Sequence, residues 1–202
     1  MSALLTPVRP KSATWNAPIP LKWTTAQFHG MCESGQFEGR RALLINGVIL
    51  EQGPMNPPHD KAATLSGYAF REAFGKGWFI REQLPLVFSL NTDPEPDLAV
   101  VFGHPRDYDD HPTTASLVLE ISDTSLRFDT NEKMSLYAAA GITDYWVLDL
   151  NSRELLIYRD PIADATAIHG ACYRVVNHYG ENDSVSPLVL PTSQIAVAEM
   201  LP

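Results

Sequence analysis

The chain has 202 residues, 45% of them hydrophobic, and a formal net charge of −9. This length and apolar content suffice for one domain with a hydrophobic core, while the acidic balance argues against non-specific nucleic-acid binding through a broad basic surface. Two cysteines, Cys32 and Cys172, are too few for a disulfide framework or a cysteine-based metal site.

The N-terminal segment lacks the features of a targeting signal. It contains no apolar stretch typical of a signal peptide, and no apolar run in the chain approaches membrane-spanning length. We therefore expect a cytoplasmic protein that does not associate with membranes. Residues 1–20 contain four prolines, which predict an irregular arm ahead of a single domain spanning residues 21–202.

The first half of the domain is predicted to contain two helices and a hairpin. Thr24 or Thr25 can cap a short helix that runs to Met31. Asn46-Gly47 between two apolar runs predicts a β-hairpin within residues 37–51, because this dipeptide favours a tight turn between strands. Residues 59–74 have apolar side chains at helical spacing and predict an amphipathic helix.

The next segments read mainly as strands. Residues 78–90 predict one bent strand or two short ones, because Pro85 interrupts them. The apolar run that follows Asp97 predicts another strand, and residues 103–116 predict a loop. Further strands are predicted at 117–122 and 142–150, with an antiparallel return through ELLIY, a loop over 160–170, and late strands at 172–176 and 184–190. Together these elements predict an α/β or α+β fold with a mixed sheet and flanking helices.

Glu120 lies in the middle of an otherwise apolar strand. Because residues two apart share a face, Val118, Glu120 and Ser122 point the same way. A carboxylate buried there requires a cationic partner. We expect that partner on the following helix, where Lys133 shares a face with Leu136 and other apolar residues and so points toward the sheet.

The start of that helix is also predicted from the sequence. Asp129 is a good N-cap, and Glu132 three residues later would complete an acidic capping box. Gly141 is a natural residue to follow the end of the helix. We therefore expect Asp129 to cap the helix rather than to act as a ligand.

These residues resemble the Uma2 family, a group within the PD-(D/E)xK, restriction-endonuclease-like superfamily. The resemblance covers residues 23–190 and depends on the order and spacing of four motifs: Pro96-Asp97, Leu119-Glu120-Ile121-Ser122, Asp129-x-x-x-Lys133-x-x-x-Tyr137, and Gly141-Ile142-x-x-Tyr145-Trp146-Val147. It implies a restriction-endonuclease-like core with a mixed central sheet, helices on its sides and an N-terminal hairpin.

The resemblance also implies a catalytic site. Asp97 and Glu120 would bind Mg²⁺ or Mn²⁺, with the backbone carbonyl of Ile121 as a third ligand, because these cations prefer oxygen ligands. The superfamily usually places its lysine two residues after the glutamate, where this chain has Ser122. The resemblance therefore implies that the lysine role has moved to Lys133, as a base or as a stabiliser of phosphate charge.

Several alternatives remain open at this stage. Asp97, Glu120 and Lys133 could form a buried ion network without a metal. His59 could cap its helix or contact the site, Ser122 could only form hydrogen bonds, and Tyr137 is expected in the core even though it lies on the same helix face as Lys133. Relatives commonly carry a glutamate at the position of Leu43, so a second metal ion would be bound poorly unless Glu38 or Glu51 compensates.

The sequence thus predicts a Mg²⁺-dependent endodeoxyribonuclease whose core residues are Asp97, Glu120 and Lys133, with His59, Ser122 and Tyr137 as accessory residues. Its partner would be DNA, and analogy with restriction enzymes suggests a homodimer. The alternative is a non-catalytic interaction module that keeps the fold and the charged network.

Overall fold

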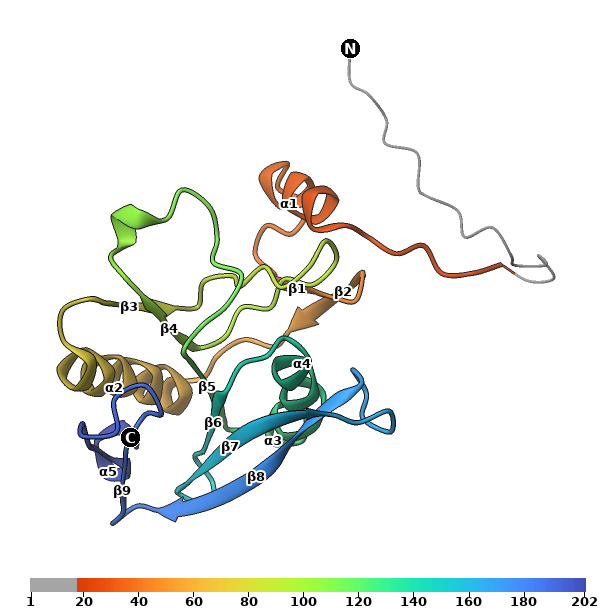
Figure 1. Cartoon of the computed structure of the whole chain (residues 1–202). Coiled ribbons are helices and arrows are strands. Elements are labelled where there is room, and N and C mark those ends of the chain that lie inside the picture. The colour runs from red at the N-terminus through yellow and green to blue at the C-terminus, as the bar shows by residue number, and fades with distance from the viewer. Residues whose placement is uncertain (1–17) are drawn as a thin grey trace.

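The computed structural model describes residues 18–202, and the predicted N-terminal arm lies outside the described residues except for its last three, which form no helix or strand. Figure 1 shows the order of the elements along the chain. They are α1 (Thr25–Glu33), β1 (Arg41–Ile45), β2 (Val48–Gln52), α2 (Pro57–Phe74), β3 (Trp78–Glu82), β4 (Leu98–Phe102), β5 (Leu117–Ser122), α3 (Leu126–Phe128), α4 (Met134–Ala139), β6 (Asp144–Asp149), β7 (Glu154–Ala163), β8 (Ala171–Gly180), β9 (Ser184–Val185), β10 (Ile195–Ala196) and α5 (Val197–Met200).

A six-stranded mixed sheet in the order β3-β4-β5-β6-β7-β8 forms the centre of the protein. Only β5 and β6 are parallel, and every other neighbouring pair in this sheet is antiparallel. The parallel pair requires a crossover connection, which α3 and α4 provide. The prediction of a mixed sheet with flanking helices is confirmed, and the crossover places α3 and α4 directly after the strand that carries Glu120.

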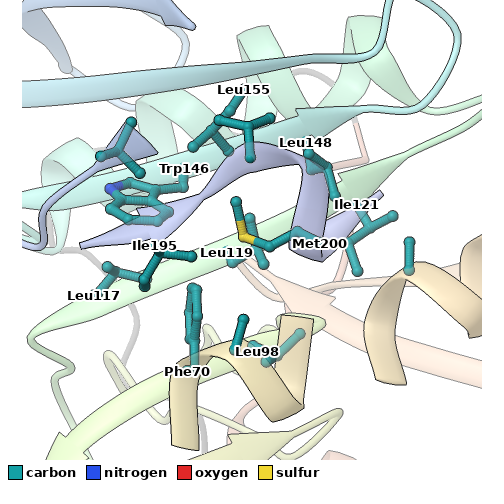
Figure 2. Close-up of a cluster of buried hydrophobic side chains, with 14 of the residues drawn as sticks. Phe70, Leu98, Leu117, Leu119, Ile121, Trp146, Leu148, Leu155, Ile195 and Met200 are labelled. Carbon is teal, nitrogen blue, oxygen red and sulfur yellow. The ribbon is translucent and has the colours of Figure 1, made fainter. Parts of the chain in front are cut away.

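The two faces of the sheet are covered by different helices because the strand residues alternate between them. One face packs against α2 and α5 through a large apolar cluster, which Figure 2 shows with Phe70 and Trp146 among its labelled residues. The rings of these two residues are nearly perpendicular, with centroids 5.7 Å apart. The opposite face packs against α4 through a second cluster that includes Tyr137, Tyr145 and Val118. Glu120 therefore points toward the α4 face, as the strand periodicity predicts.

The predicted hairpin forms a separate two-stranded sheet of β1 and β2. Asn46 and Gly47 both adopt left-handed backbone conformations, with φ angles of 49° and 74°, as a tight hairpin turn requires. Several hydrogen bonds fix the hairpin to the rest of the protein, among them the following two. The amide of Asp93 donates to the carbonyl of Leu44 at 2.7 Å, and Asn46 Nδ2 lies 2.8 Å from His169 Nδ1.

Some element boundaries differ from the predictions. In the predicted 78–90 region only β3 is a strand, because Gln83 adopts a left-handed φ of 50° and Pro85 has no N–H to donate. β7 extends to Ala163, so the loop between β7 and β8 is shorter than predicted. At its other end, β8 extends beyond the predicted strand to Gly180. Over the predicted 184–190 strand, only Ser184–Val185 pairs in a sheet.

The prediction that Asp129 caps the helix is wrong. The helix begins three residues earlier at Leu126, and Asp129 has helical backbone angles inside it. Residues Asp129–Lys133 form a π-helical turn between α3 and α4, in which the amide of Met134 donates to the carbonyl of Asp129. The carboxylate of Asp129 is buried and has side-chain partners, which explains why it does not serve as a cap. Glu132 contacts His169 instead of completing a capping box.

Within residues 18–202, no helix has the length and apolar character needed to cross a membrane.

Candidate active site

Asp97 lies immediately before β4 and is only 7% exposed. Its Oδ2 atom accepts a hydrogen bond from the backbone amide of Ile121 at 2.8 Å and lies 3.2 Å from His59 Nε2. Because Ile121 follows Glu120 on β5, the amide contact fixes the Asp97 carboxylate beside the strand that carries the second acidic residue.

Glu120 is almost completely buried, with 1% of its surface exposed. Its Oε2 atom lies 2.7 Å from Lys133 Nζ, and its Oε1 atom accepts a hydrogen bond from the Tyr137 hydroxyl at 2.6 Å. The amide of Asp97 donates to Oε2 at 3.4 Å. The structure thus brings together Asp97 and Glu120 from two neighbouring strands and Lys133 from the crossover helix.

Asp129 is a third carboxylate of this site, although the sequence predicts it only as a helix cap. Its Oδ1 atom lies 3.4 Å from Lys133 Nζ, and its Oδ2 atom accepts hydrogen bonds from the hydroxyls of Ser122 and Ser125 at 2.6 and 2.5 Å. The four-residue spacing between Asp129 and Lys133 was an available signal, because residues at that spacing are neighbours on a helix. Ser122 acts through hydrogen bonding, as the sequence predicts.

His59 contacts the site and does not cap α2. The cap is Asn56, whose side chain accepts from the amide of His59 at 3.1 Å, and Pro57 occupies the first turn. This capping places the His59 ring beside Asp97. Among the described residues, the buried Nδ1 atom of His59 has no hydrogen-bond partner.

The electrostatics of the site follow from burial and from an excess of carboxylates. Burial, reinforced by Asp97 and Asp129 and opposed by Lys133, raises the pKa of Glu120 to about 8. Burial alone would lower the pKa of Lys133, but Glu120, Asp129 and Asp97 more than offset it, so the pKa of Lys133 is raised. The ammonium group therefore stays protonated across the physiological pH range.

The other two ionisable groups influence each other. Burial alone would lower the pKa of His59, but the hydrogen bond to Asp97 reverses the effect, so the pKa of His59 is raised. Burial alone would raise the pKa of Asp97, but His59, Lys133 and the amide of Ile121 more than offset it, so the pKa of Asp97 is lowered. At neutral pH, Asp97 is therefore an anion held beside a readily protonated imidazole.

The charged residues lie at the floor of a cleft of about 400 Å³. One wall comes from the β1–β2 hairpin, another from the start of α2, and a third from β5 and α3. Several residues that line this cleft are not predicted from the sequence: Arg41, Leu50, Met55, Asn56, Asp123, Ser125 and Phe128. No local pattern marks them, because they come from four separate segments that only the folded chain brings together.

The donor set fits a hard divalent cation. Within residues 18–202, no three His, Cys, Asp or Glu side chains converge closely enough to form a complete metal cage. Mg²⁺, however, keeps several waters and often binds through one or two carboxylates. Three buried carboxyl groups face a single lysine and His59 here, and the pKa of Glu120 is raised, so a cation at this site would replace the proton on Glu120 and favour its ionised form.

The position of Leu43 bears on a second metal ion. Leu43 lines the same cleft and is 1% exposed, so this wall has a buried apolar side chain at the position where the family resemblance leads us to expect an acidic one. Glu51 also lines the cleft but is exposed near Arg40, and Glu38 lines a different hollow. Of the acidic residues that the sequence offered as replacements, only Glu51 therefore reaches this cleft.

Comparisons with known proteins agree with this architecture. No curated protein matches the chain. A solved structure described as "a putative nuclease belonging to DUF820" from Anabaena variabilis aligns with a TM-score of 0.65 and 13% sequence identity, covering 91% of this chain and 97% of that one, which shows a shared fold. The family model Uma2, described as "Putative restriction endonuclease", matches residues 25–198. The chain therefore belongs to the Uma2 family of restriction-endonuclease-like proteins.

Proposed function

We propose that this protein is a Mg²⁺-dependent endodeoxyribonuclease that hydrolyses phosphodiester bonds in DNA. The observation that carries this proposal is the convergence of Asp97, Glu120 and Lys133 at the floor of one cleft, with more carboxylates than cations around them. Membership of the Uma2 family and the nuclease description of the structural neighbour support the same reaction class.

In this proposal Asp97 and Glu120 hold the cation, Mg²⁺ or Mn²⁺, together with the backbone carbonyl of Ile121. When bound, the cation would neutralise charge on the phosphate and favour deprotonation of a nearby water. Lys133 stabilises negative charge on the phosphate. Because its neighbours raise its pKa, Lys133 keeps its proton and does not act as the general base. Of the two roles that the sequence left open for Lys133, catalytic base and stabiliser of phosphate charge, we therefore propose the second.

The accessory residues hold these groups in place. The Tyr137 hydroxyl fixes one oxygen of Glu120, and Ser122 fixes Asp129, which lies on the other side of Lys133. The hydrogen bond to Asp97 favours the protonated form of His59, which lines the cleft, so in this proposal His59 donates a proton to the leaving oxygen. By analogy with restriction enzymes, in which two sites cut two strands, we extend the proposal to a homodimer, which sedimentation of the purified protein would test.

A second function has one observation in its favour. Both oxygens of Glu120 already have partners in Lys133 and Tyr137, so the charged network is complete without a metal. That arrangement suits a non-catalytic interaction module that keeps the fold and uses the buried ion network for structural purposes. In that case neither metal binding nor DNA cleavage is expected.

One experiment separates the two functions. Calorimetric titration with Mg²⁺ or Mn²⁺ and nicking of supercoiled plasmid are measured on the wild type, Asp97→Asn and Glu120→Gln, with the exposed loop variant Asp109→Asn as a control. The nuclease predicts binding and nicking in the wild type and in the control, and loss of both in the two site variants. Equal heats in all four proteins, without nicking, would refute the nuclease and favour the interaction module.

A further inference from the structure

We infer that the cleft accepts an unpaired DNA strand or an extruded nucleotide rather than the backbone of an intact duplex. This inference rests on the proposed nuclease function and names the form of its substrate. It depends on three features of the cleft: the depth of the charged groups, the apolar character of the walls, and the sign of the local charge.

The reacting groups lie too deep for a shallow contact. Asp97, Glu120 and Lys133 are 7%, 1% and 5% exposed, and the hairpin, the start of α2 and α3 rise around them. A phosphate must enter the cleft to reach them. The backbone of a paired strand is held in a stiff double helix, whereas an unpaired strand can bend and carry a single phosphate inward.

The walls offer surfaces for a base that has left its stack. Leu50 is half-buried and lines the cleft from the hairpin, where it packs over the buried Leu43 directly opposite it. Met55 and Phe128 line it from the start of α2 and from α3, and the Phe128 ring lies 5.8 Å from Lys133 Nζ. Apolar and aromatic side chains contact the faces of unpaired bases, which a duplex keeps stacked against each other.

The charge of the cleft opposes binding of a long phosphate backbone. Five carboxylates line it, against two permanent cations, Arg41 and Lys133, and the imidazole of His59. The whole chain has a net charge of −9. Proteins that hold duplex DNA neutralise many phosphates with lysine and arginine. A bound cation and apolar contacts to one or two bases are better suited to this cleft than a series of phosphate contacts.

The test compares three DNA substrates of the same sequence in the presence of Mg²⁺ or Mn²⁺. They are a labelled single strand, the corresponding duplex, and a duplex with a bulge of unpaired nucleotides. We expect the single strand and the bulge to be cut at least about tenfold faster than the duplex, with cuts in the bulged substrate confined to the unpaired nucleotides. Duplex cut as fast as the single strand would overturn this inference and leave the nuclease function intact.

Substitutions of the apolar side chains that line the cleft test whether the cleft itself causes the preference for unpaired DNA. Leu50→Ala and Met55→Ala should each weaken binding of a fluorescent single strand several-fold while metal affinity is unchanged, and Leu90→Ala serves as the control because Leu90 is 85% exposed outside the cleft. Binding is measured separately from cleavage. Tighter binding of the single strand than of the duplex without any cutting would support this inference and refute the nuclease. Equal binding of both forms, or wall variants that bind like wild type, would refute the inference.

Discussion

Lys133 Nζ lies 2.7 Å from Glu120 Oε2 in a part of the protein where both residues are almost completely buried. The lysine also lies 3.4 Å from Asp129 Oδ1. Among the described residues, no other lysine or arginine side chain lies within salt-bridge distance of Glu120 or Asp129. A buried charge that loses its partner is far more costly than the pair itself. The stability of the folded protein therefore depends on a positive charge at this site, either the ammonium group of Lys133 or a metal cation that replaces it.

Replacing Lys133 by methionine tests this dependence. Lys133→Met leaves the buried carboxylates without their ammonium group, and we expect the free energy of unfolding to fall by about 3–5 kcal/mol. Mg²⁺ should restore much of this loss by supplying the missing positive charge. The measurement is denaturant unfolding with and without Mg²⁺ at pH 8. Lys61→Met, on the exposed face of α2, is the control, and an equal loss in both variants would contradict the prediction.

The raised pKa of Glu120 predicts a pH dependence of stability. Its pKa is about 8 in the folded protein and near the ordinary value of 4.5 in the unfolded chain, so between these values the folded state binds more protons. Metal-free stability should therefore fall as pH rises from about 5 to about 8, by up to about 1.4 kcal/mol per pH unit from this group. His59, whose pKa is also raised, contributes in the same direction, because its stabilising contribution is lost as pH rises.

The variant Glu120→Gln separates the contribution of Glu120 to the pH dependence of stability from that of His59. The variant cannot titrate at this position, so its stability should vary less between pH 5 and pH 8 than that of the wild type. In wild-type protein, affinity for Mg²⁺ should increase over the upper part of the same range, because the cation competes with the proton on Glu120. Unfolding curves at several pH values test the first statement and calorimetry tests the second. Parallel pH profiles for the two proteins would be inconsistent with a raised pKa at Glu120.

Tyr137 and Tyr145 provide a matched pair of variants. Both are fully buried with rings 4.9 Å apart, but the Tyr137 hydroxyl donates to Glu120 and the Tyr145 hydroxyl donates to the carbonyl of Asp129. Each change to phenylalanine should destabilise the protein by about 1–3 kcal/mol. Only Tyr137→Phe should change the pH dependence and the metal affinity, because only it removes a donor from Glu120. Identical effects of the two variants on metal binding would exclude a specific role for Tyr137.

Asp129 is predicted to position Lys133. In Asp129→Asn the lysine loses one of its two anionic partners, and the hydroxyls of Ser122 and Ser125 lose a charged acceptor. We expect a loss of about 1–3 kcal/mol in stability and slower DNA cleavage with nearly unchanged metal affinity. Asp110→Asn, in an exposed loop, is the control. A loss of metal affinity as large as that of Asp97→Asn would instead make Asp129 a ligand.

The sequence predicts the centre of the site better than its surroundings, for a physical reason. The period of two along β5 and the helical spacing around Lys133 are local, so they determine which way Glu120 and Lys133 point. The hairpin is likewise predicted from Asn46-Gly47. Its position beside the cleft is not predicted, because that depends on contacts such as Asn46 with His169, which are 123 residues apart in the chain.

The wrong prediction for Asp129 arises because its side chain has more than one possible partner. Asp129 is a favourable cap when only its neighbours in sequence are considered, but in the folded protein its carboxylate contacts Ser122 and Lys133. For His59 the sequence leaves two alternatives open, a helix cap or a contact with the site, and the structure shows the second, because Asn56 is the cap and the imidazole contacts Asp97. In both cases a tertiary contact determines the outcome, and a single sequence does not reveal it.

The π-helical turn at Asp129–Lys133 marks a point where the chain holds one residue more than a regular α-helix needs. Removing one residue there, such as Thr130, would allow the segment to relax into a regular α-helix while the flanking turns keep their orientation, because a π-helical turn absorbs the extra residue locally. Removing one residue from α4 has no such outlet and would rotate the residues on one side of it by roughly 100° around the helix axis. We therefore expect deletion of Thr130 to leave Lys133 facing Glu120 and to disturb the site less than deletion of Ser135.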